Sequence, residues 1–138
     1  MAALRLATTV RVDLQRWAEE AWPREACGLL VGRQGASAGA VVRATLARNL
    51  RAHERGDRYE VDPVDHLTAW KAAQAEGLEV LGAWHSHPDH DAQPSATDRA
   101  ESHAGLVYLI LAVRAGRAGE LRAWSLEDGA FFEVSIDG

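Results

Sequence analysis

Apolar residues recur every three or four positions in two segments, which is the spacing of one face of an α-helix. The first segment predicts a helix over Val12–Ala21, and Pro23 would end it because proline cannot continue a helix. The second predicts a helix over Val64–Glu76, with Pro63 at its start and Asp62 as its N-cap. The apolar positions behind these predictions are Leu14, Trp17, Ala18, Ala21, Leu67, Trp70, Ala73 and Ala75.

Short apolar runs predict β-strands over most of the remaining chain. The run Cys27–Val31 is wholly apolar and is closed by Gly32, which is typical of a strand covered on both faces. Gly35 and Gly39 frame a turn after it, and the charged stretch Asn49–Arg58 is expected to form an exposed loop. The expected strands are Leu4–Val10, Cys27–Val31, Val41–Ala47, a brief Tyr59–Val61, Glu79–Trp84, Leu106–Val113, Leu121–Leu126 and Ala130–Ile136.

The order of these elements indicates the fold class. The expected strands outnumber the helices, and the last three follow one another through glycine-rich turns. A doubly wound parallel sheet would instead alternate strands and helices along the chain. The sequence therefore predicts an α/β chain of the α+β type, in which helices flank a mixed sheet.

The composition is that of one ordinary globular domain spanning residues 1–138. Hydrophobic residues make up 47% and charged residues 25% of the chain, which excludes disordered and fibrous classes. Lysine and arginine number 15 against 20 acidic residues, so the net charge is −5, and no basic run stands out. This pattern argues against nucleic acid as the main partner.

The single cysteine, Cys27, favours a reducing compartment. It cannot form an internal disulfide or build a zinc site from thiolates, and its apolar surroundings favour a packed core residue over a nucleophile. Residues Met1–Val10 lack the apolar core of a signal peptide, and no apolar run is long enough to span a membrane. The sequence therefore predicts a cytoplasmic protein with no membrane partner.

The segment from Trp84 to Asp98 concentrates side chains that bind metals. In an extended chain His85 and His87 point to the same side, because side chains alternate with a period of two. Catalytic zinc usually takes three protein ligands and leaves the fourth position to water, so a third ligand must come from elsewhere. Asp98, in the first turn of a helix expected over Ser95–Ala104, can be brought back by the intervening loop.

A purely structural interpretation of the same residues stays open. An isolated His-x-His pair is weak evidence for a metal. Ser95 would cap a helix, and Asp98 would lie favourably near the positive end of the helix dipole. The two features together, one loop apart, favour a metal site, and the cap and ligand roles of Asp98 do not exclude each other.

The other candidate residues have ordinary interpretations. His90 could face a substrate, but a solvated loop position is favoured, and His66 and His103 are expected on helix surfaces or behind the site. Trp84 is expected to pack under the site, and Ser86 to support the histidines rather than to react.

Four segments resemble one known family. His-Ser-His-Pro at 85–88, followed after six residues by Ser-x-x-Asp at 95–98, is similar to the metal signature of the JAMM, or MPN, metallopeptidases. The earlier Pro23–Gly32 resembles the segment that carries this family's essential glutamate, and Asn49 with Tyr59–Pro63 resembles the stretch before the middle helix of short bacterial members. The resemblance covers most of the chain. It implies the JAMM/MPN fold, a curved mixed sheet whose layering is similar to that of cytidine deaminases.

The resemblance also implies a role for each residue of the site. His85, His87 and Asp98 would bind one zinc ion. Glu25 would hold the attacking water as general base and then pass the proton to the leaving amine. Ser95 would donate a hydrogen bond to the developing oxyanion. The residues alone do not show which glutamate would act as the base. Only the resemblance selects Glu25 from the candidates Glu19, Glu20, Glu25 and Glu60.

The substrate implied by the resemblance is a small carrier protein. Short bacterial members are associated with sulfur-carrier proteins, from which they remove a C-terminal cysteine or another adduct. A zinc peptidase or isopeptidase that cuts the amide after a Gly-Gly C-terminus of a ubiquitin-like or sulfur-carrier protein is therefore expected. The chain is too short for the insertions with which eukaryotic deubiquitinases grip ubiquitin, so a deubiquitinase is the less favoured alternative. The sequence leaves the oligomeric state open, and a homodimer is one of the alternatives.

Three other classes fit less well. A non-catalytic scaffold of the same fold would lack a ligand or the glutamate, whereas this sequence keeps all of them. A zinc deaminase would need a His-x-Glu and a later Cys-x-x-Cys, which a single cysteine excludes. A zincin peptidase would need His-Glu-x-x-His, which the sequence lacks.

Overall fold

Two helices and seven strands make up the regular structure of the computed structural model, which describes residues 3–35, 38–51, 59–96, 98, 102–103 and 105–137. Their order along the chain is β1 (Ala3–Leu6), α1 (Thr8–Ala21), β2 (Cys27–Gln34), β3 (Ala38–Ala47), α2 (Pro63–Ala75), β4 (Glu79–Pro88), β5 (Val107–Arg114), β6 (Arg117–Glu127) and β7 (Ala130–Asp137).

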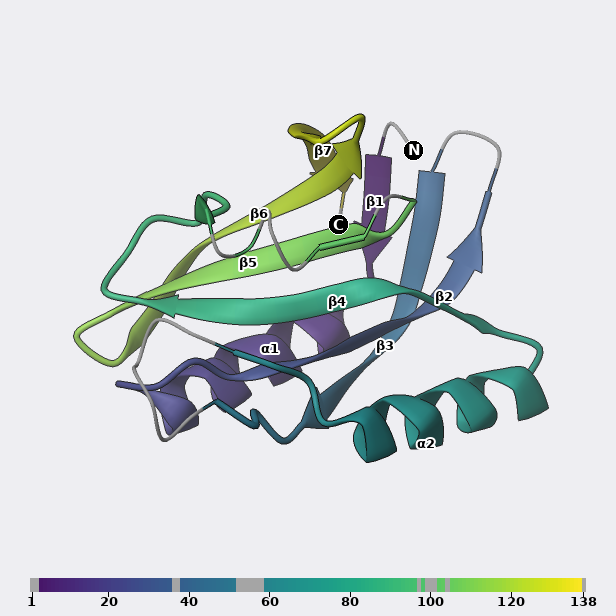
Figure 1. Cartoon of the computed structure of the whole chain (residues 1–138), viewed down its shortest axis with the longest axis horizontal. Helices are drawn as coiled ribbons and strands as arrows, with labels where there is room; N and C mark the ends of the chain where they lie inside the picture. The colour runs from purple at the N-terminus through teal and green to yellow at the C-terminus, as the bar shows by residue number, and fades with distance from the viewer. Residues whose placement is uncertain are drawn as a thin grey trace.

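The strands join into one closed, mixed sheet (Figure 1). Their order is β1-β3-β2-β4-β5-β6-β7, and β1 closes the barrel by pairing in parallel with β7. The β1–β3 and β4–β5 pairs are also parallel, whereas the other pairs are antiparallel. The predicted α+β fold with a mixed sheet flanked by helices is confirmed, and the structure adds that the sheet closes on itself.

The two helices cover opposite faces of this sheet. α1 places Val10 and Leu14 in the main core, where they meet side chains from every strand. Trp84 on β4 belongs to that core, and its ring stacks on the ring of Trp17 from α1. Its neighbour Ala83 points to the other face, since side chains alternate along a strand, and there it packs in a cluster with α2. The face of β4 that carries Ala83 is the face on which the site is built.

Two predicted boundaries are wrong. The strand expected over Leu4–Val10 ends at Leu6, and α1 begins at Thr8, because the apolar positions of this stretch suit a helical face as well as a strand. The strand expected to end at Trp84 continues to Pro88, because β5 pairs with it in parallel as far as that residue. The second correction places the two candidate histidines, His85 and His87, within the sheet and not in a loop after it.

Two smaller elements also differ from expectation. The strand predicted at Tyr59–Val61 is reduced to a single bridge between its last residue and Asn49. β2 extends to Gln34 and β3 begins at Ala38, so Gly39 lies in a strand and does not frame the turn.

Several expectations concern residues only partly described. The helix expected over Ser95–Ala104 is described as helical at residues 96 and 98, and residues 52–58 of the expected loop lie outside the described ranges. Cys27 is fully buried, as predicted. In the ranges that the structure describes, no helix combines the length and apolar character needed to cross a membrane.

Candidate metal centre

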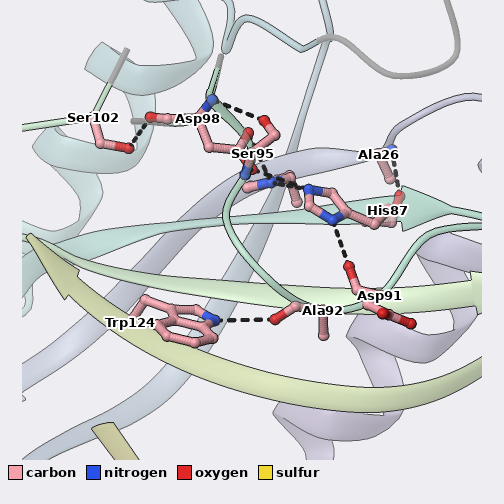
Figure 2. A network of polar contacts seen from close by, with 10 residues as sticks. Ala26, His87, Asp91, Ala92, Ser95, Asp98, Ser102 and Trp124 are labelled. Atoms are coloured by element: carbon pink, nitrogen blue, oxygen red, sulfur yellow. Dashed lines mark hydrogen bonds and ion pairs between the residues drawn. The ribbon is translucent and has the colours of Figure 1, made fainter. Parts of the chain in front are cut away.

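β4 carries His85 and His87 side by side on the α2 face of the sheet. Both side chains are buried, and their Nε2 atoms lie 3.1 Å apart. The carboxylate of Asp98 reaches both, with Oδ1 at 3.3 Å from Nε2 of His85 and Oδ2 at 3.0 Å from Nε2 of His87. The structure thus brings the three predicted ligands together. Figure 2 shows two of them, His87 and Asp98.

These spacings fit a tetrahedral metal ion. Zinc binds imidazole nitrogen and carboxylate oxygen at about 2.0–2.2 Å, so two ligand atoms of one tetrahedron lie about 3.3–3.6 Å apart. The three observed separations, from 3.0 to 3.3 Å, are close to this edge length. Two imidazoles with one carboxylate are also a ligand set that zinc accepts. The donor atoms therefore match a metal ion in both chemistry and spacing.

Neighbouring residues orient the two histidine rings. Nδ1 of His87 lies 2.7 Å from the carbonyl oxygen of Asp91, so this nitrogen carries the proton and leaves Nε2 as the free donor (Figure 2). The ring of His85 stacks on Tyr59, with centroids 4.2 Å apart. Burial lowers the pKa of His85, and a hydrogen bond to Asp98 compensates for only part of this effect. The lowered pKa favours the neutral ring that a metal requires.

Asp98 serves as a helix-start residue and as a site residue at once. Its N–H donates to Oγ of Ser95 over 3.0 Å, and Ser95 N–H donates to its Oδ2 over 2.8 Å, which is the reciprocal pattern of a capping box. Burial alone would raise the pKa of this carboxyl, but hydrogen bonds with His85 and His87 outweigh burial and hold the pKa well below its usual range. The structural and functional interpretations of this residue therefore coexist.

Glu25 is held beside the histidines by its own backbone. Its carbonyl oxygen accepts a hydrogen bond of 3.0 Å from Nδ2 of Asn49, and the next residue, Ala26, exchanges two hydrogen bonds with Ser86. A carboxylate oxygen of Glu25 and one nitrogen each of His85 and His87 all lie within 4.8 Å of one another. Glu25, which only the family resemblance could select from the sequence, thus lies at the site.

Both carboxylates reach the histidine pair, so two sets of three ligands are geometrically available. Asp98 is in direct contact with both rings, whereas Glu25 lies at up to 4.8 Å in the other set. The shorter contacts favour Asp98 as the third ligand and leave the carboxyl of Glu25 beside the three ligand groups.

Asn49 and Tyr59 support the site, whereas the sequence marked them only as part of a stretch that resembles the family and assigned them no role at the site. Oδ1 of Asn49 accepts hydrogen bonds from the N–H groups of Arg51 and Glu60, while its amide holds Glu25. This one side chain ties the segment that carries Tyr59 to the segment that carries the glutamate. The isolated bridge from Asn49 is a contact between loops, and no periodicity in the sequence marks such a contact.

Replacing Ser86 by alanine is expected to destabilise the protein by about 1–3 kcal/mol, because the buried N–H of Ala26 would lose its partner. Chemical denaturation of the metal-free protein measures this change. Ser135→Ala, at an exposed position on β7, is the matched control and should stay within about 0.5 kcal/mol. Equal stability of the two variants would contradict a structural role for the Ser86 hydroxyl.

Two cavities flank the histidine pair along β4. The first, here called the apolar groove, has a volume of about 550 Å³ and lies toward α2. It is lined by Leu29, Tyr59, Glu60, Val61, His66, Trp70, Val80, Gly82, Ala83, His103, Leu106 and Tyr108. The second, here called the polar pocket, has a volume of about 330 Å³ and is lined by Glu25, His87, Pro88, His90, Asp91, Gln93 and Ser95. An extended substrate that follows β4 would pass from one cavity across the site into the other.

The chain resembles several known proteins. It is 40% identical over 115 residues to a desampylase of Haloferax volcanii, covering 83% of this chain and 78% of that protein. It is 28% identical over 117 residues to a CysO-cysteine peptidase of Mycobacterium tuberculosis, covering 83% and 77%. A solution structure of a Desulfitobacterium hafniense protein superposes with a TM-score of 0.86 at 29% identity, covering 97% and 91%.

A family comparison agrees with these relatives. Residues 8–127 match the family described as prokaryotic homologs of the JAB domain, a stretch that includes both helices, the histidine pair and Asp98. The resemblance inferred from the metal signature is therefore confirmed, and the chain belongs to the prokaryotic JAB family, which is of the JAMM/MPN type.

Proposed function

We propose that this protein is a zinc peptidase that hydrolyses the amide bond after the C-terminus of a small ubiquitin-like or sulfur-carrier protein. The observation that carries the proposal is the convergence of His85, His87 and Asp98, with separations of 3.0–3.3 Å, beside the buried carboxyl of Glu25. His85, His87 and Asp98 would hold the metal. A zinc ion at this position would polarise the scissile carbonyl and lower the pKa of a water molecule.

The remaining steps belong to side chains of this chain. Glu25 accepts a proton from the attacking water and donates it to the leaving nitrogen. Its position suits this role, because its carboxyl lies near both histidines and lines the polar pocket. Ser95 donates a hydrogen bond to the oxyanion. Its Oγ accepts from the N–H of Asp98, and this leaves its own proton available to donate. His87 is held in the required tautomer by the carbonyl of Asp91.

The substrate class is supported by the relatives and by the apolar groove. The matched proteins carry the names desampylase and CysO-cysteine peptidase, and a Thermus thermophilus relative is named a probable TtuB-protein conjugate cleaving protease. The groove reaches the site through Tyr59, whose ring contacts His85, and its outer end is formed by α2. A carrier would dock on the groove and direct its Gly-Gly tail past Tyr59. A cytoplasmic location stays a prediction from the sequence.

Replacing Trp70 by alanine is expected to raise KM for a carrier conjugate about 10-fold, because large apolar anchors dominate protein interfaces. Trp70 lines the groove and is 47% exposed. The rise should be much smaller for a short peptide that ends in Gly-Gly, which cannot reach α2. Phe132→Ala is the matched control, since Phe132 is 54% exposed on β7. A conjugate KM that is the same in both variants would contradict docking on the groove.

The metal is tested separately from the substrate. Purified protein should contain about one zinc ion per chain, as expected of a three-ligand site. Elemental analysis after gel filtration measures this content, and dialysis against a chelator should remove the ion. Protein that takes up no zinc while its three ligands are intact would contradict the proposal.

A further inference from the structure

The loop after β4, residues 89–93, supplies the group that orients one ligand of the metal centre. Nδ1 of His87 donates to the backbone carbonyl of Asp91 over 2.7 Å. Losing such a partner usually lowers metal affinity about 10- to 100-fold, because the ring of the ligand is no longer held in place. The side chain of Asp91 is 70% exposed and pairs with the exposed Arg114, a type of contact that fixes a backbone only weakly. The position of this carbonyl therefore depends on neighbouring residues of the loop.

Trp124 on β6 holds the residue that follows. Its Nε1 donates to the carbonyl oxygen of Ala92 over 3.0 Å, and Figure 2 shows this bond together with the one between His87 and Asp91. Ala92 is fully buried, and it packs with residues of β5 in a small cluster that the ring of Trp124 also joins. Two successive carbonyl groups thus accept hydrogen bonds, one from the metal ligand and one from Trp124.

The sheet places Trp124 on the face that carries the site. Trp124 on β6 is paired with Tyr108 on β5, and paired residues of antiparallel strands point to the same face. Tyr108 packs with Ala83 in the cluster on the α2 face, whereas Ala123, the residue before Trp124, lies in the main core on the other face. The indole therefore reaches the loop from the same side of the sheet as the histidine pair.

The two ends of the loop are held differently. At the first end, Asp89 donates its N–H to a carbonyl of β5 over 2.6 Å, and its carboxylate accepts from the N–H of Ala115 and from Nε1 of Trp22. The loss of one of these bonds leaves the other two in place. At the far end, the hydrogen bond that Ala92 forms within the described part of the chain comes from Trp124. The indole N–H of Trp124 is therefore the contact whose loss would free this end of the loop.

We propose that Trp124 is a positioning residue for the metal centre: its indole N–H fixes residues 91–92, and the carbonyl of Asp91 then keeps the ring of His87 in the orientation that binds the metal. This inference rests on the metal site of the proposed peptidase. Trp124 acts through the loop, since its Nε1 bonds to Ala92 and not to a ligand group. Because coupling between two equilibria is reciprocal, metal binding should stabilise the Trp124 bond by the same factor by which the bond strengthens metal binding.

Zinc affinity tests this role without any substrate. Trp124→Phe removes the N–H and keeps an aromatic ring, and it should raise the Kd for zinc about 10-fold in competition with a chelator of known affinity. Trp22→Phe is the matched control, because it removes an indole N–H that donates to Asp89 in the same loop, and it should change the Kd less than about 2-fold. A Trp124→Phe variant that binds zinc as tightly as the parent would overturn the inference and leave the proposed function intact. A parent protein that binds no zinc would overturn both.

The reciprocal effect is measured on the parent protein, so it does not depend on how a variant folds. Zinc binding should slow the solvent exchange of the Nε1 proton of Trp124, followed by NMR, about 10-fold more than that of Trp84. Nε1 of Trp84, a residue of the main core, donates to the carbonyl of Thr45, so its exchange reports the stabilisation of the whole protein. Equal slowing at the two indoles would contradict a role for Trp124 at the metal centre.

Discussion

Glu25→Gln is expected to lower the rate of amide hydrolysis by about 10²- to 10⁴-fold, the usual contribution of a general base. The amide has nearly the same shape as the carboxylate but cannot accept the proton of water. The backbone hydrogen bond from Asn49 and the bond between Ala26 and Ser86 are retained in this variant, so folding and zinc content should not change. Single-turnover cleavage of a carrier conjugate, with zinc content measured on the same sample, checks both parts.

Glu20→Gln is the matched control, because Glu20 is exposed near the end of α1. It should keep full activity. A Glu25→Gln variant that turns over normally would remove the assignment of the base. A variant that loses its zinc would instead make Glu25 a ligand, in line with the alternative set formed with His85 and His87.

His87→Ala is expected to abolish zinc binding and to lower activity by more than about 100-fold. Loss of a residue that only supports a ligand costs 10- to 100-fold, so loss of a ligand should cost more. The substitution also leaves the carboxylate of Asp98 buried with one fewer histidine partner. Zinc titration by calorimetry, together with the cleavage assay, measures both effects.

His90→Ala, three residues further along the chain in the loop after β4, is the matched control for metal binding. His90 lines the polar pocket but contacts neither of the histidine Nε2 atoms in the described structure, so this variant should bind zinc as tightly as the parent. Stoichiometric zinc in His87→Ala would show that the metal lies elsewhere.

The histidine pair was predictable from local geometry. His85 and His87 are two residues apart on one strand, so alternation alone places them on one face, and this holds although β4 was expected to end before them. Asp98 needed more than geometry, because Ser95 and Asp98 satisfy a helix start without any metal. Only its spacing from the histidines made it a candidate ligand.

The rest of the site depends on contacts across the fold. Glu25 comes beside the histidines because β2 pairs with β4, with Cys27 opposite His85, and no spacing within the sequence encodes that register. Asn49 and Tyr59 act through loop contacts, and the polar pocket needs the loop that Trp124 holds from β6. The fold class could be predicted from the order of the elements. Closure of the barrel could not, because it pairs β1 with β7 and so joins the two ends of the chain.

The most direct test of the proposed function is intact-mass spectrometry of one conjugate. A ubiquitin-like carrier ending in Gly-Gly, linked to the side chain of a lysine peptide, is incubated with the zinc-loaded protein. The predicted result is release of the carrier with a free Gly-Gly terminus and of the intact peptide, lost after chelation and restored by zinc. A conjugate that stays uncleaved with folded protein containing stoichiometric zinc would contradict the assignment of this site as a carrier-directed peptidase.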